Sequence, residues 1–151
     1  MVRTNVPENG QPVRYSVKKD EILRGDKQFH RLIREGKTVR AGSILCHYKI
    51  QTTPNSQPRT VLRAGFSVPR RGMNKAVDRN RVKRLMREAY RVNKQILSEH
   101  LQWNDCSLDL LFIYRGKTTQ KPRYLKIDDV KPDMIRCLEL VSARIDERKN
   151  V

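Results

Sequence analysis

The stretch Asp78–Arg91, DRNRVKRLMREAYR, decides the fold that we expect for this sequence of 151 residues. Its apolar residues recur at the spacing of about 3.6 residues that places side chains on one face of an α-helix. The apolar face holds Val82, Leu85, Met86, Ala89 and, further along, Ile96. The opposite stripe holds Asn80, Lys83, Arg84, Arg87, Arg91 and Lys94. The pattern predicts the longest helix of the chain, from about Arg79 to His100, with Asp78 as its N-cap and its apolar face on a sheet.

The positive charge of the chain is concentrated around this helix. The whole sequence holds 33 Lys and Arg against 16 Asp and Glu, a net charge of +17. Residues 69–94 carry ten Lys or Arg and two acids, a net charge of +8, which leaves +9 for the other 125 residues. So large an excess destabilises a compact protein by self-repulsion unless a polyanion neutralises it. A solvated helix normally interleaves both signs, with pairs such as Arg84 and Glu88, so this nearly acid-free stripe favours nucleic-acid binding.

The residue types of the stripe suit a sugar–phosphate backbone. Arginine presents a planar fork of N–H donors that matches phosphate oxygens, which lysine cannot copy. Asn80 adds a neutral donor and acceptor for a base edge or a 2′-hydroxyl group. The helix N-terminus and the preceding loop Gly72–Asn74 supply backbone N–H groups that also favour phosphate.

The remaining composition argues against several other classes of protein. No stretch approaches the ~20 apolar residues of a membrane-spanning helix, and the first 20 residues lack the apolar core of a signal peptide. We therefore expect a cytoplasmic protein without membrane attachment, and the sequence indicates no obligate protein partner. Cys46, Cys106 and Cys137 are too scattered for a disulfide framework or a zinc site, so we expect reduced, partly buried cysteines.

Upstream of the cationic helix, the pattern predicts one helix and two strands. The helix runs from Asp26, as its N-cap, to Arg34 or Glu35, and Gly36 ends it. Its apolar residues are Phe29, Leu32 and Ile33. The strands cover 43–50 and 61–68, and we expect them to pair as an antiparallel hairpin across a turn rich in proline and asparagine. In the second strand, one face holds Leu62, Ala64, Phe66 and Val68, and the other holds Arg63, Gly65 and Ser67.

Downstream, the pattern predicts a buried central strand and a final helix. The strand is the apolar run Leu108–Tyr114, so residues 61–114 form a strand–helix–strand crossover. The helix spans about Val130 to Asp146, with Pro132 in its first turn. Its inner face holds Val130, Met134, Leu138, Val141 and Ile145. The fold class is therefore α+β, a two-layer sandwich in the order helix, strands, helix, strand, helix. We expect a disordered extension over 1–19, one domain over 20–147 and a tail over 148–151.

Two motifs resemble those of the bacterial ribonuclease P protein family. Residues 79–90 match the family signature R-N-R-apolar-K-R-x-x-R-[EQ]-A-[FY]. Residues 63–71, RAGFSVPRR, are similar to the family strand R-x-G-x-S-V-x-K-K, with arginine for both lysines. The similarity extends from about Ile22 to Ile145 and departs at Gly72–Val77, where the glycine is displaced and one residue is inserted. The resemblance implies a small α/β sandwich with a left-handed βαβ crossover, against the usual right-handed rule.

The resemblance also implies a function. The family protein is the RNA-binding subunit of a ribonucleoprotein enzyme whose catalytic RNA hydrolyses a phosphodiester with Mg²⁺ and removes the 5′ leader of precursor tRNA. The protein contributes affinity and leader discrimination, so we expect no catalytic or metal-ligating residue in this chain. By resemblance, the residues that contact RNA are Arg70, Arg71, Arg79, Asn80, Arg81, Lys83, Arg84, Arg87 and Arg91.

In this family the leader groove lies between the first helix and the sheet. The matching residues here are Phe29, Tyr48, Ser67 and Arg71. An aromatic side chain in such a groove stacks an unpaired base for roughly 1–3 kcal/mol with little sequence demand. The alternative is that Phe29 and Tyr48 are ordinary core residues. Ile33 stands where the family often has a second aromatic, and a shift of one residue in strand register would put His47 in place of Tyr48.

Two other functions stay open on the residues alone. A ribosome- or translation-associated RNA-binding protein would carry the same charge but not the two joined motifs. A metal-dependent nuclease needs clustered carboxylates that hold Mg²⁺. The candidate carboxylates, which lack a catalytic spacing, are Asp105, Asp109, Asp128, Asp129 and Asp133. Two of them lie beside a predicted helix start, where capping explains them.

Overall fold

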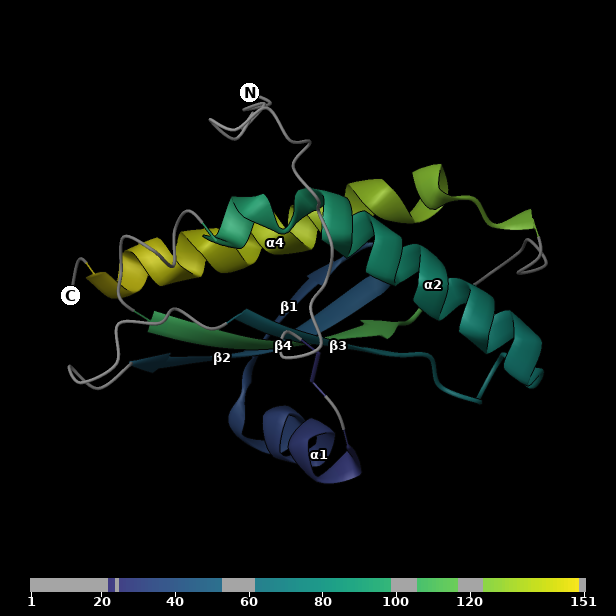
Figure 1. Ribbon diagram of the computed structural model, residues 1–151, viewed down its shortest axis with the longest axis horizontal. Helices are drawn as coiled ribbons and strands as arrows, with labels where there is room; N and C mark the ends of the chain where they lie inside the picture. The colour runs from purple at the N-terminus through teal and green to yellow at the C-terminus, as the bar shows by residue number, and fades with distance from the viewer. Residues whose placement is uncertain (1–21, 24, 53–61, 99–105, 117–123, 150–151) are drawn as a thin grey trace, which may run out of the picture.

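A four-stranded sheet with helices on both faces forms the framework of the molecule (Figure 1). The computed structural model describes residues 22–23, 25–52, 62–98, 106–116 and 124–149. One face of the sheet is covered by α1 (Asp26–Glu35), and the other is covered by α2 (Ala76–Asn93) and α4 (Ile127–Lys149) (Figure 1). The predicted α+β class is confirmed, and α1 adds a helix on the second face to the expected sandwich of helices on a sheet. The expected extension over 1–19 lies outside the described residues.

The order of the strands differs from the expected hairpin. The strands are β1 (Lys37–Ala41), β2 (Ile44–Thr52), β3 (Leu62–Ser67) and β4 (Cys106–Tyr114), in the spatial order β1-β2-β4-β3. β2 pairs antiparallel with β1 and with β4, and β3 pairs parallel with β4. The predicted pairing of β2 with β3 is therefore wrong. β4 lies between them because it is the most apolar strand and is buried on both faces, which a central position provides.

The parallel pair β3–β4 confirms the predicted strand–helix–strand crossover through α2. The strand β1, which the sequence pattern missed, is short and mostly exposed and carries polar side chains. At the other edge of the sheet, Leu23 donates its backbone N–H to the Ala64 carbonyl at 2.9 Å. Ile22 forms a parallel bridge with the same residue, so the chain entering α1 covers part of the edge of β3.

The first helix has the predicted span but a different start. Its N-cap is Gly25, at φ 94°, and Asp26 is the first helical residue rather than the cap. A positive φ suits glycine, which explains why the cap is not the acidic residue. The predicted stop at Gly36 is confirmed, and its N–H donates to the Leu32 carbonyl at 2.8 Å. Leu32 is buried, whereas Ile33 is 45% exposed, so the apolar face of α1 is narrower than expected.

The two long helices begin earlier than predicted. α2 starts at Ala76, so Asp78 lies in its first turn and is not its cap, and α2 ends at Asn93. α4 has 23 residues against 18 in α2, so α4, and not α2, is the longer helix. The N-terminus of α4 is capped by Asp129, whose carboxylate accepts the Lys126 N–H at 2.8 Å. Because this cap starts the helix at Ile127, Pro132 lies in the second turn and not the first.

The main core lies between the sheet and the α2–α4 layer, and a smaller core lies under α1. The predicted inner faces are confirmed, because the main core includes Val82, Met86, Ala89, Val130, Met134, Leu138, Val141 and Ile145. The smaller core holds Leu23, Leu32, Leu111 and Ile113. Cys46 and Cys137 are buried and free, as expected, and burial raises the pKa of the Cys137 thiol to about 12. No helix in the described ranges is long and apolar enough to cross a membrane.

Candidate nucleic-acid interface

One side of α2 is buried, so the opposite side of this helix faces solvent. Val82, Met86 and Ala89 are fully buried against the sheet and α4. On the opposite side, Asn80 and Arg84 are exposed. We call the exposed and half-exposed residues Asn80, Lys83, Arg84 and Arg87 the cationic face of α2. The predicted amphipathic division of this helix is therefore confirmed.

The charges of this face lack acidic neighbours. Within the described part of the chain, no carboxylate lies within ion-pair distance of Lys83 or Arg84. The guanidinium carbon of Arg87 lies 5.9 Å from the centre of the Phe66 ring, a cation–π contact that leaves the positive charge in place. Glu88 pairs with Arg91 rather than with Arg84, and the Arg91 Nε donates to the Glu88 carboxylate at 3.0 Å. Arg91 thus lies on the predicted stripe, but its charge is matched.

Two arginines of the predicted RNA-binding set turn toward the protein. Arg79 donates from Nη1 to the backbone carbonyls of Met73 at 2.9 Å and Asn74 at 2.8 Å. Arg81 donates from Nη2 to the Leu125 carbonyl at 2.9 Å. Arg79 therefore holds the loop before α2, and Arg81 ties α2 to the segment before α4. Their direct contact with RNA remains a prediction, but the structure gives both a positioning role.

The loop before α2 is anchored to the core by one apolar residue. Met73 is buried, and its N–H donates to the Arg70 carbonyl at 3.0 Å, so this donor of the predicted phosphate loop is already used. Gly72 has φ 90°, a conformation that favours glycine and that accounts for its displaced position in the motif. Arg70 and Arg71 are exposed beside this turn. The loop therefore extends the cationic surface beyond the end of β3.

The face of the sheet that α1 covers, which we call the α1 face, holds two of the four predicted groove residues, Phe29 and Ser67, and one rival, His47. Phe29 lies over Gly65, where a Cβ atom would come within 2.7 Å of its ring. Ser67 alternates with Gly65 and lies on the same face of β3. Tyr48 does not belong to this face, because it is 2% exposed in the main core on the opposite side of β2. The α1 face instead receives His47, so the predicted place of Tyr48 is wrong by one residue of register.

His47 is the aromatic side chain that β2 contributes to this face. Burial, and then the nearby charge of Arg115, lower the pKa of its imidazole. Its Nδ1 is buried and has no hydrogen-bond partner among the described residues. A buried polar atom without a partner is uncommon, and it marks a place where a ligand or solvent donor is accommodated.

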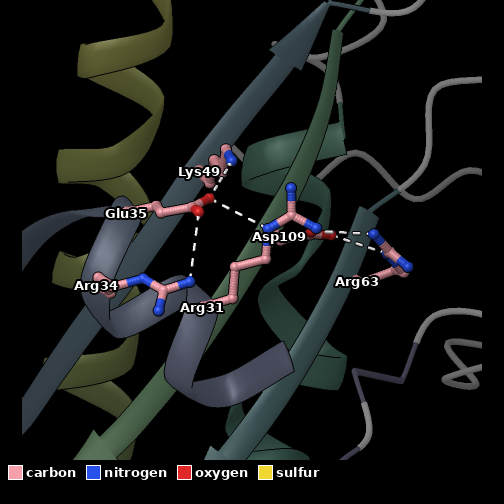
Figure 2. A network of polar contacts seen from close by, with 6 residues as sticks. All are labelled: Arg31, Arg34, Glu35, Lys49, Arg63 and Asp109. Carbon is pink, nitrogen blue, oxygen red and sulfur yellow. Dashed lines mark hydrogen bonds and ion pairs between the residues drawn. The ribbon is translucent and has the colours of Figure 1, made fainter. Parts of the chain in front are cut away.

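At the other end of the α1 face, six residues form an ion-pair cluster (Figure 2). Its members are Arg31, Arg34, Glu35, Lys49, Arg63 and Asp109. Glu35 accepts from Lys49 at 2.7 Å and from Arg31 at 3.2 Å, and these bonds lower the pKa of the Glu35 carboxyl to about 2. Arg63 and Asp109 form a bidentate pair at 2.8 and 3.0 Å across β3 and β4. Four members of the cluster line a pocket together with Leu23, Gln28 and Leu32; they are Arg31, Lys49, Arg63 and Asp109.

Three of the five candidate carboxylates of a nuclease have other uses, and Asp105 lies outside the described residues. Asp109 pairs with Arg63, and Asp129 caps α4. Asp133 accepts from the backbone N–H of Ser43 at 3.0 Å and from its hydroxyl at 2.7 Å, which ties α4 to the turn between β1 and β2. In the described ranges, no group of three or more His, Cys, Asp or Glu is placed to hold a metal ion. We therefore derive no metal-dependent step from the residues of this chain.

Sequence reasoning missed Glu35, Lys49, Asp109 and Gly65 as parts of the α1 face. A signal was present for two of them. Asp109 interrupts the apolar run of β4, and an isolated charge in a buried strand requires a partner. Gly65 interrupts β3, and a strand glycine often marks close approach of another group. Glu35 and Lys49 carried no such signal, because ordinary charged residues are mostly solvated.

The fold and these two surfaces define a class: a small α+β protein with a cationic helix on one side of its sheet, on which Lys83 and Arg84 have no acidic partner among the described residues. Comparison with known proteins is more specific. The family model Ribonuclease P matches residues 17–137. The ribonuclease P protein component of Chlorobaculum tepidum is 38% identical over 106 residues, 68% of this chain and 69% of the relative. That of Dictyoglomus thermophilum is 32% identical over 116 residues, 77% of this chain and 86% of the relative.

Solved structures agree on the fold. The ribonuclease P protein from Thermotoga maritima superposes with a TM-score of 0.59 at 23% identity, covering 80% of this chain and 96% of that one. The protein from Staphylococcus aureus gives 0.56 at 20% identity, covering 82% and 96%. The chain belongs to the ribonuclease P protein component family. It is thus a subunit of a tRNA-processing endoribonuclease and a partner of the ribonuclease P RNA.

Proposed function

We propose that this chain binds the ribonuclease P RNA through the cationic face of α2 and the 5′ leader of precursor tRNA along the α1 face. The RNA carries out the hydrolysis with Mg²⁺, in the bacterial cytoplasm, and the protein strengthens the complex. The observation that carries the proposal is the absence of acidic partners for Lys83 and Arg84 in the described part of the chain.

The distribution of ion pairs supports the choice of α2. Carboxylates accompany the arginines of α1 and those of α4 at positions 136 and 144. The described residues offer no acid to Lys83 and Arg84, whereas an RNA backbone offers phosphates at regular spacing along a helix surface. Asn80 lies at the edge of the same face and suits a 2′-hydroxyl group or a base edge.

The leader proposal rests on the open end of the α1 face. Phe29 is half-buried over Gly65, so its ring is held in one position while part of it stays accessible. His47 and Ser67 lie on this face, and Arg71 is exposed just beyond the end of β3. An aromatic surface with hydrogen-bond donors at its rim accepts single-stranded nucleic acid of varied sequence. Tyr48 is not part of this proposal.

The proposal assigns Mg²⁺ to the RNA. Asp109, Asp129 and Asp133 already serve a salt bridge, a helix cap and an inter-element hydrogen bond. A two-metal nuclease site would need such carboxylates to converge on one point. The role left to this chain is to supply positive charge near the RNA, which lowers the Mg²⁺ concentration needed for a folded, substrate-bound complex.

Reconstitution tests the proposal. Precursor tRNA is incubated at near-physiological Mg²⁺ with the chain alone, with the cognate ribonuclease P RNA alone, and with both. We expect leader removal to be strongly stimulated only in the mixture. Cleavage by the chain alone would instead identify a protein nuclease, and no stimulation in the mixture would contradict the proposed role.

A further inference from the structure

The aromatic ring of Tyr124 is displayed on the surface beside α2. Among the described residues, four large apolar side chains are strongly exposed: Ile33, Val77, Val92 and Tyr124. Tyr124 is the aromatic one of the four, at 61% exposure. The next residue, Leu125, is only 6% exposed and belongs to the main core. The backbone is therefore anchored directly beside a ring that faces solvent.

The segment that carries this ring is bonded to the flank of the cationic helix α2. Arg81 donates to the Leu125 carbonyl at 2.9 Å, so the peptide that follows Tyr124 is bonded to α2. Side chains three and four residues from Arg81 are its neighbours on the helix, and these include Arg84 and Val77. Val77 is 78% exposed. Arg81 therefore joins the flank of α2 that exposes Val77 to the segment that carries Tyr124.

The segment that carries Tyr124 is ordered before any ligand arrives. Lys126 donates its N–H to the Asp129 carboxylate at 2.8 Å and accepts the Asp129 N–H at 3.0 Å. With Leu125 buried, both residues after Tyr124 are held by the protein. A tyrosine has few rotatable bonds, and a pre-ordered backbone further reduces the entropy that binding must overcome.

We propose that Tyr124 stacks an unpaired base of the ribonuclease P RNA at the edge of the cationic face of α2. This inference rests on the proposed function, because it places the base next to the phosphates that Lys83 and Arg84 bind. Two described cations flank the segment that carries Tyr124, the exposed Lys126 along the chain and Arg81 on α2, and they favour a polyanion over an apolar protein surface. Stacking needs only the π-face of a base, and it does not depend on the phosphate charge.

The test compares three substitutions in the full chain by measuring binding to the cognate ribonuclease P RNA over a series of salt concentrations. Tyr124→Ala should weaken binding roughly 5- to 150-fold, the range for loss of one stacked base. Tyr124→Phe should stay within about twofold of the parent, because the ring remains. Tyr124→Lys should also bind more weakly than the parent although it adds a cation. The slope of log K against log salt should stay at the parent value for Ala and Phe, because no phosphate contact is removed.

Several outcomes would overturn the inference. These are parent-like binding by Tyr124→Ala, equal losses in Tyr124→Ala and Tyr124→Phe, stronger binding by Tyr124→Lys, or a flatter salt slope in Tyr124→Ala. Because the ring is mostly exposed, the thermal midpoints of the variants should match the parent, and Tyr124→Lys provides a second replacement without a ring if Ala perturbs folding. If the parent chain itself fails to bind the RNA, the proposed function fails, whereas parent binding without a Tyr124 effect removes only this inference.

Discussion

The cationic face of α2 and the ion-pair cluster on the α1 side are both rich in arginine and lysine, yet they differ in what faces the charges. In the cluster, Glu35 and Asp109 accept from Lys49, Arg31 and Arg63. On α2, Lys83 and Arg84 have no such acceptors in the described ranges. The cluster is self-contained and mainly holds α1 and the strands together. A count of basic residues alone would rank the cluster, with four, above the cationic face, with three, whereas the acids separate a structural surface from a binding surface.

The largest effect should come from removing two charges from the unpaired surface. Lys83→Ala combined with Arg84→Ala should weaken binding to ribonuclease P RNA roughly 100-fold, about tenfold for each phosphate contact, and reduce the salt slope by about 1.4 to 1.8. Arg31→Ala combined with Arg34→Ala removes the same net charge from the cluster and serves as the matched control. We expect that control to bind within about threefold of the parent, because surface pairs contribute little. Equal losses in both double variants would show that only the net charge matters.

A second substitution tests whether the α1 face binds without relying on charge. Phe29→Ala should weaken binding of precursor tRNA to the reconstituted enzyme by about tenfold while binding of mature tRNA stays unchanged, because only the former carries a leader to stack. Phe29→Tyr keeps the ring and should restore most of the affinity. Equal losses for both substrates, together with a lower thermal midpoint, would instead identify Phe29 as a residue of the smaller core.

A smaller effect is expected when the cluster loses its more buried acid. Asp109→Asn should lower the free energy of unfolding by about 1 kcal/mol, because Arg63 keeps its place but loses a charge-assisted bidentate partner. The Arg63 side chain is 36% exposed, so water compensates part of the loss. Urea denaturation measures the change, and RNA affinity should not fall. A loss of RNA affinity at an unchanged free energy of unfolding would show that the cluster binds RNA and does not stabilise the fold.

The smallest effect concerns the pH dependence of stability. The pKa of Glu35 is lowered to about 2 from an ordinary value of 4.5, so the folded state favours the ionised carboxylate. Its stabilising contribution is complete above pH 4.5 and is lost as the pH falls toward 2. Between these values Glu35→Gln should show a shallower fall of thermal midpoint than the parent. Parallel pH profiles for the two proteins would contradict the proposed pairing with Lys49.

Much of the fold could be predicted because it follows from local periodicity. The faces of α2 and α4 and the burial of β4 were evident from residues such as Met86, Met134 and Phe112, whose spacing or continuity is visible in the chain. The short edge strand β1 and the position of β4 between β2 and β3 were not, because strand pairing joins residues far apart in sequence. The register that places His47, and not Tyr48, on the α1 face depends on the same long-range pairing.

The amino-acid sequence by itself determined that this protein has one amphipathic cationic helix, a buried strand and a family signature, since these depend on residue type and spacing along one element. Only the tertiary structure decided which cations are matched. In the folded chain, Arg79 and Arg81 donate to backbone carbonyls. Arg63 and Lys49 pair with carboxylates from other elements. Lys83 and Arg84 face outward. The physical reason is that an ion pair or hydrogen bond depends on distances of about 3 Å between atoms, and such distances between remote residues exist only once the chain has folded.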